Sequence, residues 1–206
     1  MLAEAGIDVR IESPSFDERS LDDRFGVLDD GALAVMIATA KARSVADRVL
    51  PDELVLAGDQ LAVVGEGTKR RALHKAPDLE SAVRQLCAIS GTTHRLVNGL
   101  VLWDPTSDRW ADAVDVHVVT MRSFSLAEAV DYVQRFEPLD SVGCYRIEDD
   151  ADLVADVIGS GDDGVQGMPL GVVRNLLDQL SSPVPGPRPG ATSQWGADRS
   201  PSPDGS

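Results

Sequence analysis

Cysteine, histidine and aromatic residues are all scarce in this chain of 206 residues. Its two cysteines, Cys87 and Cys144, lie far apart and belong to no Cys-x-x-Cys or Cys/His spacing. The sequence therefore favours neither a disulfide nor a structural zinc site, and we expect two small, buried residues of a reducing compartment. The three histidines are scattered and form no metal-ligand motif.

Positive charge is also scarce, because 19 lysines and arginines face 34 acidic residues and leave a net charge of -15. Such a surface repels a nucleic-acid backbone or an anionic membrane, so we expect neither as a partner. An anionic ligand would need local cations to hold it. No apolar run approaches the roughly 20 residues of a membrane span, and no signal peptide opens the chain. We expect a cytoplasmic protein.

The hydrophobic content of 43% is enough for one ordinary core, and it is concentrated before the last 26 residues. Residues 181–206 hold half of the twelve prolines, with many serines and glycines. A segment of this composition cannot bury enough surface to offset its ordering entropy. The sequence predicts a folded domain over residues 1–180 and a disordered tail over residues 181–206.

Local patterns predict alternating strands and helices in the folded part. The predicted strands are 6–13, 54–64, 96–103, 114–121 and 154–158. The predicted helices are 32–46 with Asp30 as cap, 78–90, one with a Ser125/Glu128 capping box, and 169–180. Mixed strands and helices without an internal repeat favour an α/β layered fold.

One acidic residue stands out because it interrupts an otherwise apolar strand pattern. Asp59 lies in Leu56-Ala57-Gly58-Asp59-Gln60-Leu61-Ala62-Val63. A core strand can deliver such a carboxylate to the rim of a sheet, where it can hold a metal or activate water. Lys75 follows in a loop beside Pro77, as expected of a site that handles an anion. Outside a larger pattern, a single acid and a single lysine are common surface features.

A series of short motifs spans most of residues 6–180, and its order supplies that larger pattern. The motifs are Asp17-Glu18, Ala40-Lys41-Ala42, Gly58-Asp59-Gln60, Lys75, Ser90-Gly91-Thr92-Thr93-His94, Asn98-Gly99, Pro138-Leu139, Gly143-Cys144-Tyr145, Glu148 and Gly167-Met168-Pro169-Leu170. In this order and spacing they resemble the Maf family of nucleoside triphosphate pyrophosphatases. The resemblance implies a mixed sheet with flanking helices, in two lobes around a deep cleft.

The resemblance also implies an activity and a set of site residues. Family members use a divalent metal, Mg²⁺ or Mn²⁺, to hydrolyse nucleoside triphosphates to the monophosphate and pyrophosphate. By position, Asp59 matches the catalytic acid and a metal ligand, and Glu18 matches a second metal ligand. Lys41 and Lys75 match cations that neutralise the phosphates. The resemblance also allows a homodimer.

Two positions bear on the base of the substrate. Gln60 and Glu148 stand where the pyrimidine-specific members of the family have threonine and glutamine. This pair resembles the branch that acts on 7-methyl-GTP. A carboxylate at Glu148 can accept hydrogen bonds from guanine N1 and N2 and lies favourably near the positive charge of the methylated ring. The plainer interpretation of Glu148 is one more acid in an acidic loop.

The chain departs from the family pattern at its first residues. The usual first strand and Ser-x-Ser-Pro-x-Arg loop have no counterpart before Gly6, and Met1–Ala5 resembles the end of the helix that follows them. We expect in-frame codons for that segment upstream of Met1. The alternative hypothesis is a catalytically impaired paralogue that binds nucleotide or a protein partner. Other departures include Asn98 in place of the usual threonine.

Overall fold

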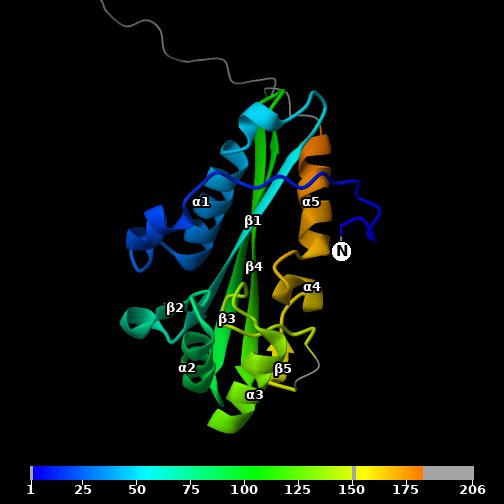
Figure 1. The fold of residues 1–206 in the computed structure, drawn as a ribbon. Coiled ribbons are helices and arrows are strands. Elements are labelled where there is room, and N and C mark those ends of the chain that lie inside the picture. Colours follow the sequence, from blue (N-terminus) through cyan, green and yellow to red (C-terminus); the bar gives the residue numbers. More distant parts are fainter. Residues whose placement is uncertain (1, 150–151, 183–206) are drawn as a thin grey trace, which may run out of the picture.

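The computed structural model describes residues 2–149 and 152–182, except for the side chains of Glu18, Arg19 and Asp22 (Figure 1). The predicted tail beyond residue 182 lies outside the described residues. The helices are α1 (Asp30–Arg43), α2 (Leu79–Ile89), α3 (Leu126–Phe136), α4 (Asp162–Val165) and α5 (Leu170–Ser181), with short 3₁₀ helices η1 (Glu18–Arg24), η2 (Ala46–Arg48) and η3 (Gly67–Lys69). The strands are β1 (Val55–Val64), β2 (Arg71–Leu73), β3 (Thr93–Asp104), β4 (Arg109–Met121) and β5 (Val154–Ile158).

The five strands form one sheet in the order β2-β1-β3-β4-β5, and every strand pairing in it is antiparallel. The expected α/β class with flanking helices is confirmed, but the expectation of a mixed sheet is wrong for the described strands. A tight turn joins β3 to β4, and the chain returns through β2 and α2 so that β3 runs against β1. Neither connection is the crossover that a parallel pair requires.

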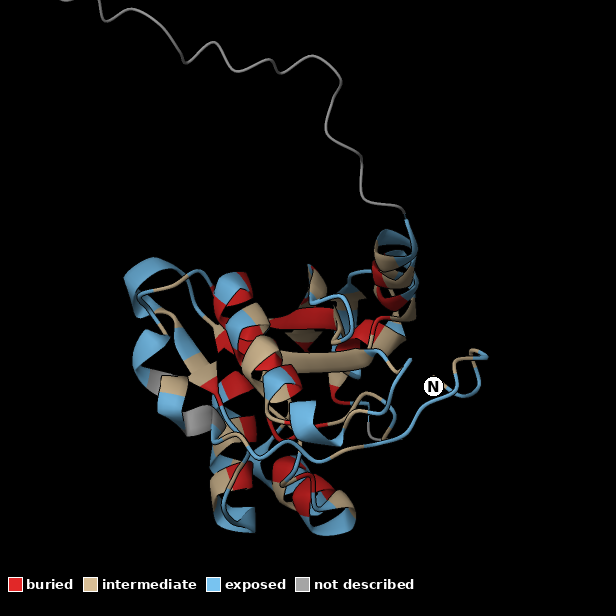
Figure 2. Cartoon of the chain, turned by 90° about the horizontal axis from the view of Figure 1, so that it is seen from above, coloured by how far each residue is buried: buried red, intermediate tan, exposed pale blue. Residues whose placement is uncertain are grey.

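The long strands β1, β3 and β4 pass through three hydrophobic core clusters, two at one end of the sheet and one at the other, and the two ends form the expected two lobes (Figure 1). At one end, α1 and α5 cover opposite faces of the sheet. At the other end, α2, α3 and β5 enclose the largest core cluster, which includes Leu86, Leu96 and Val133. Buried residues accordingly lie on the sheet and on the inward sides of the helices (Figure 2).

The middle strands and most helices follow the local patterns. Ser125 and Glu128 form the predicted capping box at the start of α3. Asp78 caps α2 through the backbone N–H of Ser81 at 2.7 Å, and β5 matches its predicted range. The patterns did not predict the three-residue strand β2 or the single-turn helix α4.

The predicted first strand is wrong. Residues 7–17 form an irregular segment that crosses from the α5 side of the molecule to the α1 side (Figure 1). Ile7 packs against the α5 core, but Ile11 is 90% exposed. The side chain of Arg10 binds Glu53 at 2.6 Å, which fixes the segment without a sheet ladder. Alternating apolar residues specify a strand only where a neighbouring strand can pair with them.

Two further expectations are corrected. Asp29 rather than Asp30 caps α1, by accepting from the N–H of Gly31 at 2.9 Å. Asp30 is instead buried and forms an ion pair with Arg95 at 2.8 Å. Both cysteines are free, as expected, but only Cys144 is buried and Cys87 is exposed on α2. No helix in residues 2–149 or 152–182 is both long and apolar enough to cross a membrane.

Helix α1 lies directly on β3 because Gly99 has no side chain. A Cβ atom there would be 2.3 Å from backbone atoms of Ala34 and Val35. We predict that Gly99→Ala lowers the free energy of unfolding by about 3 kcal/mol or more, because a helix backbone cannot yield as a side chain can. The control is Gly171→Ala in α5, where a Cβ meets nothing within 4 Å and alanine should add up to about 1 kcal/mol. Urea unfolding measures both, and equal stabilities would contradict this role of Gly99.

Candidate active site

A cavity of about 310 Å³ lies against the edge of β1 between the two lobes. Three consecutive residues of that strand, Gly58, Asp59 and Gln60, contribute to its wall. Successive side chains of a strand point to opposite faces, so one cavity can touch all three only at the strand's edge. The edge is open there because β2 pairs only with residues 62–64 of β1. The cavity therefore reaches both faces of the sheet.

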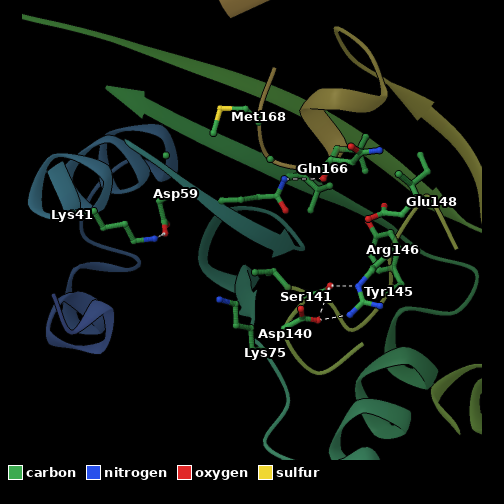
Figure 3. A pocket seen from close by; sticks show the side chains of 17 residues that line it. Lys41, Asp59, Lys75, Asp140, Ser141, Tyr145, Arg146, Glu148, Gln166 and Met168 are labelled. Carbon is green, nitrogen blue, oxygen red and sulfur yellow. Dashed lines mark hydrogen bonds and ion pairs between the residues drawn. The ribbon is translucent and has the colours of Figure 1, made fainter. Parts of the chain in front are cut away.

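Asp59 and Lys41 meet on the α1 side of this cavity. The Nζ atom of Lys41 lies 2.7 Å from Oδ1 of Asp59, a short ion pair (Figure 3). The two side chains are only 16% and 8% exposed, so water screens this pair less than a surface salt bridge. Helix α1 brings Lys41 to β1 because it packs across Gly99, which is opposite Asp59 in the sheet register.

The other predicted residues line the same cavity, with one exception. Lys75 lies on the loop before α2, is exposed, and forms no ion pair with any described residue. Glu148 lies across the cavity from the Lys41–Asp59 pair (Figure 3), and is likewise exposed and without an ion pair among the described residues. Glu18 begins η1, but its side chain lies outside the described part of the structure.

Several lining residues were not assigned a role from the sequence. Arg146 is the most informative, because it adds a third cation and binds Asp140 and the Oγ atom of Ser141. Tyr145 and Met168 supply apolar surface on opposite walls (Figure 3). The two loops that carry Tyr145 and Met168 were among the motifs found in the sequence, but no role was predicted for either residue. The convergence of these loops on β1 depends on tertiary structure, which a local motif does not contain.

The charges in the cavity differ from those of the whole chain. Three cations, Lys41, Lys75 and Arg146, are present with three acids, Asp59, Asp140 and Glu148. In the chain as a whole, acidic residues outnumber basic ones 34 to 19. The lining of the cavity is therefore balanced in charge, and an anion meets less repulsion there than from the acidic chain as a whole.

One histidine supports the wall of the cavity from behind. The Nε2 atom of His94 lies 2.8 Å from the hydroxyl of Tyr145, and both residues are buried. Burial lowers the pKa of His94 from 6.5 to about 4, so the ring is neutral near pH 7. Burial also raises the pKa of the Tyr145 hydroxyl, which stays protonated.

Known proteins with similar sequences place the chain in a family. The family described as Maf-like protein matches residues 1–180. The chain belongs to the Maf family. It is 33% identical to a 7-methyl-GTP pyrophosphatase of Bartonella quintana over 172 residues, which cover 82% of this chain and 84% of the relative. It is also 35% identical to a nucleoside triphosphate pyrophosphatase of Granulibacter bethesdensis over 188 residues, covering 87% and 90%.

A third relative has a different named substrate. The chain is 29% identical to a dTTP/UTP pyrophosphatase of Acetivibrio thermocellus over 190 residues, covering 89% of this chain and 90% of the relative. Maf relatives at similar identity are thus named for a purine substrate and for pyrimidine substrates. Overall sequence identity therefore does not distinguish a purine from a pyrimidine substrate, and the residues of the cavity are the better guide to the base.

The neutral state of His94 makes stability depend on pH. Its pKa is lower in the folded protein than in the unfolded chain, so its contribution is complete above about pH 6.5 and is lost as the pH falls towards 4. At pH 5 we expect the loss to be about 2 kcal/mol. Urea unfolding at pH 7.5 and pH 5 should show His94→Gln losing about that much less stability than the unmodified protein. Equal losses in the two proteins would contradict the buried neutral histidine.

Proposed function

We propose that this Maf protein hydrolyses a nucleoside triphosphate to the monophosphate and pyrophosphate. The observation that carries the proposal is the short Lys41–Asp59 ion pair at the open edge of β1, in a cavity shared with Lys75, Gln60 and Glu148. The names of its relatives, which are pyrophosphatases of nucleoside triphosphates, support the same reaction. Such an enzyme is a hydrolase acting on acid anhydrides.

In the proposed mechanism Asp59 orients a water molecule and accepts its proton as the water oxygen attacks the α-phosphorus. A new bond forms between that oxygen and phosphorus, and the bond from the α-phosphorus to the bridging oxygen breaks. The electron pair leaves with pyrophosphate. Lys41 lies beside this carboxylate, and Lys75 and Arg146, which line the same cavity, would neutralise charge on the phosphates and the leaving pyrophosphate.

The proposed cofactor is Mg²⁺ or Mn²⁺. Among the described residues no group of three or more histidines, cysteines or acids could hold a metal by itself. This donor set still fits Mg²⁺ at a triphosphate, because such ions are usually held by one or two carboxylates together with phosphate oxygens and water. Asp59 would supply one carboxylate and Glu18 a second. When bound, the ion neutralises phosphate charge and polarises the phosphoryl oxygens.

We predict that Asp59→Asn lowers kcat by a factor on the order of 10²–10⁴, because an amide cannot accept the proton of the attacking water. The measurement is pyrophosphate release from the triphosphate in Mg²⁺, with a chelator-treated sample as the blank. Asp112→Asn is the control, because Asp112 is exposed on β4 and does not line the cavity, and we expect this variant to keep its turnover. If turnover is unchanged in Asp59→Asn, Asp59 has no role in the reaction.

For the base we propose 7-methyl-guanine. Glu148 faces the cavity with an exposed carboxylate, opposite the reacting pair, and can accept from the N1 and N2 donors of guanine. Its negative charge also attracts the positive charge that N7 methylation gives the ring. The nucleotide would then extend across the cavity (Figure 3), with its base near Glu148 and its phosphates near Lys41 and Lys75.

We predict that Glu148→Gln lowers the preference for 7-methyl-GTP over dTTP and UTP by about 10- to 100-fold in kcat/KM. The change removes a charge-assisted hydrogen bond of about 1.5–3 kcal/mol. Glu80→Gln on α2 removes the same charge away from the cavity and serves as control. Faster hydrolysis of dTTP than of 7-methyl-GTP by the unmodified protein would refute the assignment of the base.

A further inference from the structure

A row of polar side chains crosses the middle of the sheet behind the cavity. Gln60 on β1, Asn98 on β3 and Asp115 on β4 are directly opposite one another in register. His117, two residues further along β4, continues the row and is fully buried. Most buried residues of the sheet are apolar, and of these four only Gln60 lines the cavity. The proposed reaction gives the other three no role.

At the His117 end of this row, a backbone group that can only donate determines which ring nitrogen carries the proton. The backbone N–H of Ser160 donates to Nε2 of His117 at 3.2 Å, so the ring proton must be on Nδ1. That nitrogen lies 3.2 Å from Oδ2 of Asp115, although at an angle poor for a straight hydrogen bond. Ser160 Oγ is 3.4 Å from Nε2, but the backbone N–H already takes the lone pair. Ser160 is thus not an activated nucleophile.

Asp115 and the carbonyl group of Gly164 set the orientation of the Asn98 amide, because a carboxylate and a carbonyl oxygen accept hydrogen bonds. The Asp115 carboxylate accepts from Nδ2 of Asn98 at 3.3 Å, and the same amide nitrogen donates to the carbonyl of Gly164 at 2.7 Å. The Asn98 amide therefore has its nitrogen towards β4 and its oxygen towards β1. A flipped amide would bring its carbonyl oxygen against two acceptors in a buried place, which is costly.

Gln60 receives the same constraint at the cavity wall. Its Nε2 atom donates to Oδ1 of Asn98 at 2.9 Å and also faces the carbonyl oxygens of Val165 at 3.0 Å and Gly164 at 3.3 Å. Its Oε1 atom accepts no hydrogen bond from any described residue and is not among the buried unpaired atoms of the described chain. With the nitrogen tied to the protein, the oxygen is the part of the Gln60 amide left for a ligand.

We propose that Asn98 and Asp115 are positioning residues that select the base by fixing the Gln60 amide as an acceptor. The proposal rests on the proposed function. Gln60 Oε1 and the Glu148 carboxylate then offer two acceptors in one cavity, which match the two neighbouring donors of guanine, N1–H and N2–H. Uracil and thymine have one N–H between two carbonyl oxygens, so one acceptor would face a carbonyl. A flipped Gln60 would present a donor and favour the pyrimidines.

Two variants of equal shape test this inference, Asn98→Thr and Asn98→Val. The threonine hydroxyl can accept from Gln60 and donate to Gly164, whereas valine can do neither. We expect Asn98→Val to lower the ratio of kcat/KM for 7-methyl-GTP to that for dTTP by tenfold or more, and Asn98→Thr to keep it close to the unmodified value. A purely structural role would lower both activities together and leave the ratio unchanged in both variants, which would overturn the proposal.

Folding and the parent reaction are controlled separately. Melting temperatures of the two variants show whether valine merely unfolds the sheet, and the smaller pair Asn98→Ser and Asn98→Ala then gives the same comparison. If the unmodified protein hydrolyses none of the triphosphates, the proposed function fails. In that case, calorimetric measurement of the binding of 7-methyl-GMP and dTMP to the unmodified protein and the two variants tests the inference without relying on hydrolysis. The inference is supported if the variant with a hydroxyl keeps the preference for 7-methyl-GMP over dTMP and the variant without a hydroxyl loses it. An equal preference in both variants, or no binding of either nucleotide, overturns the inference.

Discussion

The close contact between α1 and Gly99 determines where the Lys41–Asp59 ion pair of the cavity lies. Because β3 has no side chain at this point, the helix backbone lies directly on the sheet. Gly99 is opposite Asp59 in the register, so the helix that lies on Gly99 also passes beside Asp59 and carries Lys41 to within 2.7 Å of it. A bulkier residue at this position would push away the helix and the lysine together. The same contact at Gly99 thus determines both the packing of α1 on the sheet and the position of the ion pair.

The two-residue period of β1 separates the two tasks of the site. Asp59 points to the α1 face, where the phosphates would be handled, and Gln60 points to the opposite face, where the polar row lies. Both can serve one cavity only because β2 leaves this part of the strand edge open. A register shift of one residue would exchange the two side chains, so in the proposed function the pairing of β1 with β3 would determine both reaction chemistry and base selection.

Local patterns predicted what depends on neighbouring residues and missed what depends on distant ones. The Ser125 capping box and β5 need only a few adjacent residues, and both were predicted correctly. Aspartate is a common helix cap, and Asp30 stands where a cap is expected. Its actual partner, Arg95, lies on β3, so no local rule could predict this ion pair. The proposed roles of Arg146 and Asn98 likewise depend on distant residues. Arg146 reaches the cavity through the path of a loop, and Asn98 lies beside Gln60 through the register of two strands. The residues of the candidate site came from an ordered set of motifs, and periodicity alone would not have given them.

The charge of the protein adds a final constraint on how the site can work. A chain of net charge -15 repels a triphosphate at long range, but salt screens charges that are more than about 8–10 Å apart. Inside the cavity the balance is set by groups within contact distance, and there the cations equal the acids in number. Lys41 is largely shielded from water, so water screens both its ion pair with Asp59 and its interaction with a bound phosphate less than it screens a surface lysine. The proposed binding of a triphosphate would therefore depend on its entry into the cavity, where the packing of α1 places Lys41 beside the carboxylate of Asp59.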